Sequence, residues 1–249
     1  YPDVLNLGDM TRYEEWNIEP IDLLVGGTPC QSFSVAGLRG GMDDARGNLA
    51  LVFVRLVARF QPQWVVWENV PGVLSSGGGR DFGSILGALA EIGYGWAYRI
   101  LDAQYFGVPQ RRRRVFVVGY LGDWRRAAAV LFERESVCGN PPPSREAGEG
   151  VAGATSPSIG ASGRGFSRAG ESRGQDPVIV SRAINAKGVR RLTPRECERL
   201  QGFPDDYTQF PYRGKPAADG PRYKALGNSM AVPVVRWIGE RIARTETIQ

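Results

Sequence analysis

Two periodicities alternate along residues 21–120. Short apolar runs with strand character separate segments whose apolar positions recur every three or four residues, as on one face of a helix. The expected strands are 21–25, 64–67, 96–101 and 115–118, and the expected helices start near residues 49 and 81. Strands that alternate with helices predict crossover connections and a mostly parallel sheet covered on both faces. We therefore expect an α/β, doubly wound fold.

Local signals predict the ends of the first two helices. Asn48 is a good N-cap for the first helix, and Pro62 ends it. Asp81 can cap the second helix, and the glycines around Tyr94 stop it.

Helical signals return after residue 190. Thr193 and Glu196 form a capping box with Pro194 at the first helical position, and Gly202 closes that helix. A last helix is expected to begin near Pro233, with one apolar face formed by Val234, Ile238 and Ile242.

Residues 139–176 have a different composition, because half of them are Gly, Pro or Ser. Such a stretch cannot bury a core, so we expect a loop or linker. Residues 160–165 resemble a dinucleotide-binding loop superficially. No strand precedes them and no periodic helix follows, which excludes that interpretation.

Charge and hydropathy leave two interpretations open. The chain of 249 residues carries a net charge of +5 with a pI near 9.3, which fits either an ordinary solvated basic surface or a polyanionic partner such as nucleic acid. No apolar run approaches about 18 residues and no signal peptide opens the chain, so we expect a cytoplasmic protein without a membrane segment.

The cysteine and histidine counts exclude several kinds of site. Cys30, Cys138 and Cys197 are far apart, which argues against a disulfide framework and against CxxC zinc sites. The absence of histidine excludes Ser-His-Asp and Cys-His nucleophiles and any His-containing metal site, and we expect no metal.

Cys30 is nevertheless a candidate nucleophile. It follows a predicted strand in a glycine-rich loop, and Glu68 follows the next predicted strand, so both are expected at the carboxyl edge of the sheet. Cationic groups can lower the pKa of a thiol without histidine, and Arg112 and Arg114 share one face of an extended segment. A thiol, a carboxyl and an arginine pair suit nucleophilic attack on an electron-poor ring.

Seven short motifs that include these residues resemble, in their order, those of the DNA cytosine-5 methyltransferases. The likeness covers roughly residues 5–120 and 190–243. The motifs are Gly8-Asp9-Met10, Pro29-Cys30-Gln31, Asp44-x-Arg46-Gly47-x-Leu49, Glu68-Asn69-Val70, Gln110-x-Arg112-x-Arg114, Arg191-Leu192-Thr193-Pro194-Arg195-Glu196 with Gln201-Gly202-Phe203-Pro204, and Gly227-Asn228-Ser229.

The resemblance implies a role for each matching residue. Cys30 would add to C6 of a flipped cytosine in double-stranded DNA, so that C5 takes a methyl group from S-adenosyl-L-methionine. Glu68 would protonate N3, and Arg112 and Arg114 would stabilise the ring and its O2 oxygen. The residues implied to line the pocket for S-adenosyl-L-methionine are Asp9, Pro29, Leu49, Asn228 and Ser229.

One part of the family pattern is missing. The family opens with a Phe-x-Gly-x-Gly loop for the methionine end of the methyl donor, and no segment before Cys30 matches it. A truncated gene record, a second polypeptide and a degenerate copy are the three explanations, and we expect truncation because the remaining motifs are intact.

The resemblance also divides the chain. It implies a Rossmann-like catalytic domain at 1–120, a small, irregular target-recognition region at 121–189, and a segment at 190–249 that ends that region and returns to the catalytic domain. Members of the family are usually monomers. A restriction–modification system, a phage and an orphan gene are the three contexts that the resemblance leaves open, and a restriction endonuclease is the expected partner in the first of them.

Three other functions compete with this hypothesis. A transfer RNA cytosine-5 methyltransferase would use the same motif order, but that group resembles Pro-Pro-Cys-Gln at the nucleophile and carries Cys-Phe-Thr, both absent here. A DNA-binding remnant would bind duplexes without methyl transfer, because the first cofactor loop is missing. A cysteine hydrolase is disfavoured by the absence of histidine.

Overall fold

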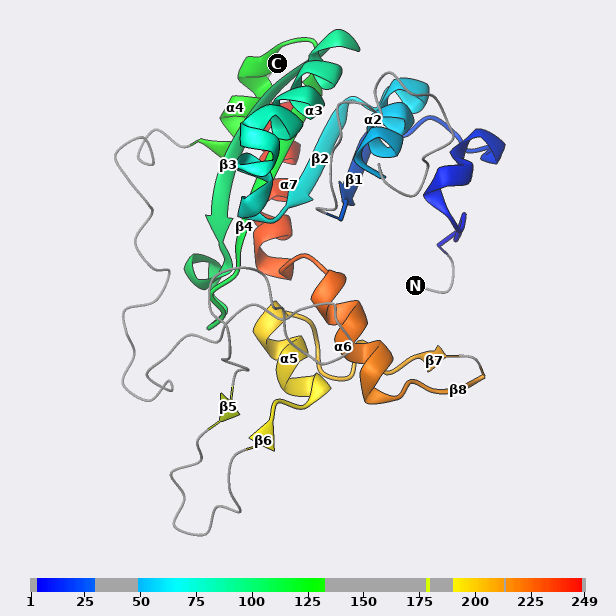
Figure 1. Cartoon of the computed structure of the whole chain (residues 1–249), viewed down its shortest axis with the longest axis vertical. Coiled ribbons are helices and arrows are strands. Elements are labelled where there is room, and N and C mark those ends of the chain that lie inside the picture. Colours follow the sequence, from blue (N-terminus) through cyan, green and yellow to red (C-terminus); the bar gives the residue numbers. More distant parts are fainter. Residues whose placement is uncertain (1–3, 30–48, 133–177, 180–189, 213, 248–249) are drawn as a thin grey trace. The chain divides into compact units, whose positions relative to one another are not determined.

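The computed structural model describes residues 4–29, 49–132, 178–179, 190–212 and 214–247 (Figure 1). The chain divides into two compact units. The first unit comprises Tyr1–Ile100, Arg114–Val137 and Arg244–Gln249, and the second comprises Leu101–Arg113 and Cys138–Ala243. Cys30, the Asn48 cap and the Gly/Pro/Ser-rich stretch at 139–176 lie outside the described residues.

A mixed four-stranded sheet forms the centre of the fold, in the order β1-β2-β4-β3. Its strands are β1 (Leu23–Gly27), β2 (Trp64–Asn69), β3 (Tyr94–Asp102) and β4 (Arg113–Leu121). β1 pairs with β2 in parallel, whereas β4 pairs with β2 in antiparallel orientation. The prediction of a mostly parallel sheet is therefore wrong for β4, which runs antiparallel to β2. The reason is the short connection from β3, which holds only the 3-10 helix η5 (Ala103–Phe106) and leaves no room for a crossover helix.

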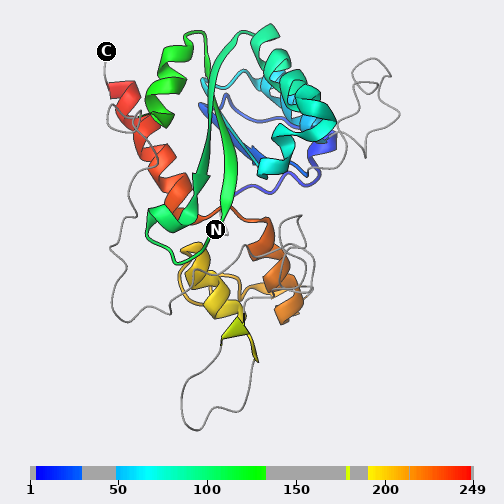
Figure 2. The ribbon, with the colours of Figure 1, turned by 60° about the vertical axis from the view of Figure 1, so that its left-hand side comes forward.

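Helices cover both faces of this sheet, as predicted (Figure 2). α2 (Leu49–Phe60) and α3 (Arg80–Glu91) pack on one face, and α4 (Trp124–Leu131) lies on the other. Val65 and Trp67 of β2 belong to the buried core with α2 and α3. On the opposite face, Arg126 of α4 lies over the ring of Tyr120.

The predicted ends of α2 and α3 are confirmed, whereas the predicted cap of α3 is wrong. α2 ends at Phe60, before Pro62 as expected, and its Phe53 ring packs so close to Gly26 that a Cβ atom there would lie 2.7 Å from the ring. Asp81 is not the cap of α3, because Gly79 occupies that position in a left-handed conformation. Asp81 lies in the first turn instead, where it accepts a hydrogen bond from the Ser76 hydroxyl.

Other short elements accompany the sheet. The 3-10 helices of the first unit are η1 (Met10–Glu15), η3 (Pro71–Leu74) and η4 (Ser76–Gly79). The last turn of α7 (Val232–Thr247) also belongs to this unit, where Glu246 accepts a hydrogen bond of 2.6 Å from the indole of Trp64.

The second unit has a small helical core. It contains α5 (Pro194–Gln201), α6 (Asp219–Asn228), most of α7, and the short strand pairs β5 (Val178–Ile179) with β6 (Arg190–Arg191) and β7 (Pro211–Tyr212) with β8 (Lys215–Pro216). The capping box of α5 and the left-handed Gly202 that ends it are confirmed. The buried face of α7 is also confirmed, with Val234, Ile238 and Ile242. The sequence did not predict α4 or α6.

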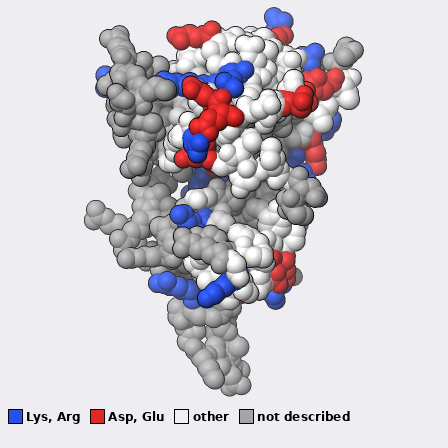
Figure 3. Space-filling model, turned by 90° about the vertical axis from the view of Figure 1, so that its right-hand side faces the viewer, with Lys and Arg blue, Asp and Glu red and all other residues white. Residues whose placement is uncertain are grey.

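Charged side chains of both signs occur on the surface (Figure 3). Among the described residues, no helix combines the length and the apolar character needed to cross a membrane.

Candidate active site

The end of β2 lies beside the segment that leads to Cys30. All six residues of β2 are buried, and the strand ends with Glu68 and Asn69. Gly27 of β1 pairs with Glu68, so Thr28 and Pro29 leave β1 next to the end of β2. Since the two strands are parallel, this edge is where ligands of open α/β sheets bind. Cys30 itself lies outside the described residues, so its predicted approach to Glu68 stays a prediction.

Glu68 forms an ion pair with Arg114. Phe116 of β4 is the register partner of Glu68, and Arg114 lies two residues before it, so both charged side chains point to the same face. The Arg114 Nε and Glu68 Oε1 atoms are 3.0 Å apart, and the side chains are only 13% and 12% exposed. Removing one member of such a buried pair typically costs about 3 kcal/mol, because the other charge stays behind in the interior. Arg114 therefore fixes the orientation of the candidate acid.

Arg112 is held inside the second unit. It is 3% exposed, and its backbone N–H donates to the Asp102 carboxylate at 3.0 Å. Its Nη2 atom donates to the carbonyl of Ser229 at 2.7 Å and to that of Gly227 at 3.4 Å. These carbonyls lie at the end of α6, where a cation also compensates the negative end of the helix dipole. The structure thus brings Arg112 to Ser229, a predicted cofactor residue.

Asn228 and Ser229 end α6. Asn228 is exposed, and Ser229 is the C-cap residue, whose hydroxyl donates to the Leu226 carbonyl at 2.8 Å. The backbone N–H of Ser229 donates to the Ala225 carbonyl, so the hydroxyl and the backbone N–H of Ser229 both stabilise the end of the helix.

Asp9, Pro29 and Leu49 lie on three separate segments of the first unit. Asp9 is exposed and caps η1, and its carboxylate accepts from the backbone N–H and the hydroxyl of Thr11, each at 2.9 Å. These hydrogen bonds keep the pKa of Asp9 below its usual value. Pro29 is exposed after β1, and Leu49 is the half-buried first residue of α2.

Sequence reasoning missed a hydrogen-bonded group beside Glu68. The Trp67 indole N–H donates to the Thr28 hydroxyl at 3.0 Å, and the Asn69 amide donates to the Thr28 carbonyl at 3.0 Å. The available signal was a tryptophan in a buried strand, since a buried indole N–H usually finds a hydrogen-bond partner. The identity of that partner depends on the register of β1 and β2.

The chain matches one protein family along most of its length. The family described as C-5 cytosine-specific DNA methylase matches residues 2–136 and 144–244. A curated protein of Escherichia phage P1, named DNA N-6-adenine-methyltransferase, is 32% identical over 98% of this chain and 56% of its own length. The type II methyltransferase M.SsoII of Shigella sonnei is also 32% identical, over 98% of this chain and 69% of that protein.

The fold resembles solved methyltransferase structures. The crystal structure of the S. pombe Dnmt2 methyltransferase covers 91% of this chain with a TM-score of 0.59, at 18% identity and over 79% of that chain.

The chain spans only part of its curated relatives. It covers little more than half of the length of the phage P1 protein and about two thirds of the length of M.SsoII.

Proposed function

Because the chain belongs to the C-5 cytosine-specific DNA methylase family, we propose that it methylates C5 of cytosine in double-stranded DNA. The methyl donor implied by the family is S-adenosyl-L-methionine. The ion pair between Glu68 and Arg114, at the sheet edge where Thr28 and Pro29 lead to Cys30, is the observation that supports this function best. It provides a largely buried carboxyl group with a fixed orientation at the end of β2, and we propose that Cys30 acts next to it.

The proposed reaction starts with the Cys30 thiolate. Its sulfur forms a bond to C6 of a cytosine that has left the base stack, and Glu68, after taking up a proton from solvent, passes that proton to N3. C5 then takes the methyl group, and the donor sulfur leaves as a neutral thioether. A base removes the C5 proton, the bond between C6 and sulfur breaks to release the Cys30 thiolate, and N3 returns its proton to Glu68. Arg112 and Arg114 stabilise the ring and its O2 oxygen in this scheme, and Arg114 also orients Glu68.

S-adenosyl-L-methionine supplies the electrophilic methyl group. The exposed Asp9 carboxylate suits a hydroxyl or ammonium donor, and the exposed Asn228 amide can both donate and accept hydrogen bonds. We assign these two residues, with Pro29, Leu49 and Ser229, to the methyl-donor site.

The region at 121–189 is the proposed target-recognition region. The type II name of M.SsoII supports a restriction–modification context. An endonuclease of matching specificity as the partner, and a monomeric state, are further parts of this proposal that rest on the family resemblance alone.

Covalent trapping tests this function. The chain is mixed with S-adenosyl-L-methionine and a duplex pool that contains 5-fluorocytosine, in which C5 carries fluorine and the intermediate cannot eliminate. We expect a denaturation-stable adduct that maps to Cys30. Cys30→Ser should abolish the adduct and methyl transfer, while Cys138→Ser serves as the matched control and should retain both.

Two results would contradict the proposal. One is methyl transfer that persists in Cys30→Ser, which would remove the nucleophile. The other is a chain that forms adducts with transfer RNA but not with duplex DNA, which would favour the RNA substrate instead.

A further inference from the structure

Thr28 is anchored to β2 by two side chains. Trp67 binds its hydroxyl, and Asn69 binds its carbonyl at 3.0 Å and its hydroxyl at 3.5 Å. All three residues are buried, with exposures of 7% for Thr28, 0% for Trp67 and 2% for Asn69. The anchor therefore lies in a dry environment, where each of its hydrogen bonds is difficult to replace with water.

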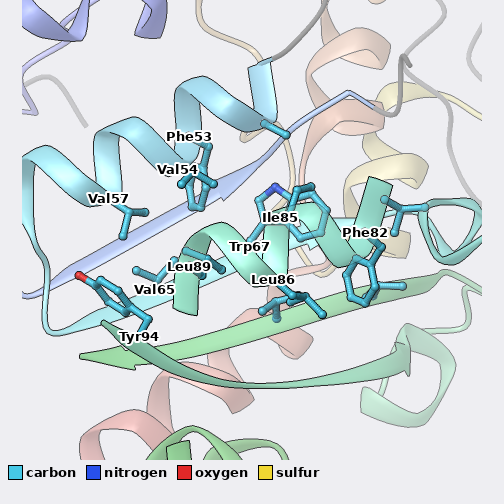
Figure 4. Packing of buried hydrophobic residues seen from close by; sticks show 14 residues of the cluster. Phe53, Val54, Val57, Val65, Trp67, Phe82, Ile85, Leu86, Leu89 and Tyr94 are labelled. Atoms are coloured by element: carbon cyan, nitrogen blue, oxygen red, sulfur yellow. The ribbon is translucent and has the colours of Figure 1, made fainter. Parts of the chain in front are cut away.

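The two donors are themselves held in place. The Trp67 ring stacks on Phe82 of α3, with ring centroids 6.3 Å apart and planes inclined by 24° (Figure 4). The Asn69 Oδ1 atom accepts a hydrogen bond from the backbone N–H of Val70 at 2.8 Å, which turns its amide N–H groups toward Thr28. The hydrophobic core and the end of β2 thus determine where Thr28 can lie.

Alternation along β2 separates this anchor from the candidate acid. Trp67 and Asn69 share one face of the strand, while Glu68 points to the opposite face and pairs with Arg114. A substitution at Thr28 or Trp67 can therefore loosen the anchor without removing the ion pair.

We propose that Thr28 is a positioning residue for the nucleophile, and that Trp67 and Asn69 act through it. Thr28 precedes Cys30 by two residues, so their Cα atoms are at most about 7 Å apart. Pro29, between them, has a backbone φ fixed by its ring. Once the Thr28 carbonyl is fixed, few torsions are left to move the Cys30 backbone. This inference rests on the proposed function of Cys30 as nucleophile.

Two variants of Thr28 test the anchor. Thr28→Val keeps the shape and loses the hydroxyl that Trp67 binds, whereas Thr28→Ser keeps the hydroxyl and is the matched control. We expect Thr28→Val to lower kcat by about three- to tenfold, the range for loss of one buried hydrogen bond, with little change in KM. Thr28→Ser should stay within about twofold of the unchanged chain. A merely structural role would lower thermal stability without this difference between kcat and KM.

A second readout is independent of methyl transfer. The rate at which iodoacetamide alkylates Cys30 is measured by peptide mass spectrometry, relative to Cys138 in the same sample. We expect this ratio to change at least about threefold in Thr28→Val and to stay near its original value in Thr28→Ser. Trp67→Phe removes the indole N–H and keeps an aromatic ring, so it should reproduce the result of Thr28→Val. If Thr28→Val does not fold, Trp67→Phe is measured in its place.

The outcomes separate the two hypotheses. Methyl transfer that persists in Cys30→Ser would reject the proposed function, while a changed alkylation ratio in Thr28→Val would still support the anchor. Folded Thr28→Val and Trp67→Phe proteins with unchanged alkylation ratios would overturn the positioning role, even if the unchanged chain methylates DNA.

Discussion

Neighbouring residues at the end of β2 serve different partners. Glu68 pairs with Arg114, while Asn69 binds the carbonyl of Thr28 on the other face. The side chains of a strand alternate between faces, so one short segment can orient an acid and anchor the adjacent loop at the same time. Glu68 and Asn69 therefore have two different roles, because Glu68 faces Arg114 on one side of the sheet and Asn69 faces Thr28 on the other.

Replacement of Glu68 by Gln should slow the chemical step. The amide keeps the size of the side chain but is a far poorer proton donor and carries no charge for Arg114, so we expect a loss of about 10²-fold or more in single-turnover methyl transfer. Glu91→Gln, at an exposed position, is the matched control and should have normal activity. A Glu68→Gln protein with a normal rate of methyl transfer and weaker DNA binding would contradict the acid role.

At the scale of single residues, the sequence predicts where some side chains of the candidate site lie but not which groups they contact. The order of strands was enough to put Glu68 at the carboxyl edge, because a buried run followed by a polar residue marks a strand end. Alternation along an extended segment predicts one face for Arg112 and Arg114, and that shared face stays a prediction. It does not identify the partner of either side chain. The contact of Arg112 with the Ser229 carbonyl joins residues 117 positions apart, and no local pattern encodes such a distance.

At the scale of elements, a buried carboxylate joins α5 to α6. Glu198 of α5 is fully buried and accepts hydrogen bonds from the Thr208 hydroxyl, from the Asp206 and Thr208 backbone N–H groups at 2.7 and 2.8 Å, and from Arg222 of α6 at 3.1 Å. Burial alone would raise the pKa of Glu198, but these hydrogen bonds outweigh it and lower the pKa below its ordinary value of 4.5. The charged form therefore stabilises the folded state.

This cluster predicts a pH dependence of stability. A carboxyl whose folded pKa is lowered stabilises the fold above its unfolded pKa of 4.5, and the contribution is lost as the pH falls through the folded pKa. We expect Glu198→Gln to lower the free energy of unfolding by about 2 kcal/mol at neutral pH, the scale of a hydrogen bond to a charged group. The substitution removes the charge nearest to Arg222 and leaves it with Asp206, whose Oδ1 atom lies 3.5 Å from the guanidinium.

Urea denaturation near neutral pH and below the unfolded pKa measures both effects. The deficit of Glu198→Gln should shrink in acid, while Glu91→Gln, at an exposed position, should resemble the unchanged chain at both pH values. A deficit that is equal at the two pH values would argue against the charged carboxylate as its cause.

Some helices could be predicted from short sequence patterns and others could not. The start of α5 was predictable because its capping box involves residues three positions apart, and the apolar face of α7 was predictable from its spacing. α6 was missed because Gly220, Pro221 and Gly227 interrupt the helical pattern. Its stability comes instead from tertiary contacts, since Leu226 is buried with Leu192 and Cys197.

At the scale of the whole molecule, the net charge of +5 favours the binding of a negatively charged partner. Lys and Arg side chains occur together with Asp and Glu side chains on the face that Figure 3 shows. Such a molecule attracts a polyanion through many weak contacts, each of which releases counterions.

We expect the affinity for duplex DNA to fall at least about tenfold between about 50 and about 200 mM salt, as release of a few counterions requires. Fluorescence anisotropy with a labelled duplex measures this slope. Cys30→Ser should bind with the same slope as the unchanged chain, because the slope counts cationic contacts to phosphate and Cys30 supplies none. An affinity that does not depend on salt would show that the positive charge plays no part in binding.

The position of β1 affects how the protein behaves in concentrated solution. Among the described strands β1 pairs only with β2, so its outer edge presents backbone donors and acceptors, and Leu23 and Val25 are 40% and 41% exposed. An edge of this kind is a template on which a strand of another molecule can assemble. Wherever no further strand covers this edge, association in concentrated solution should involve β1, and Val25→Lys should raise the solubility limit of the purified chain.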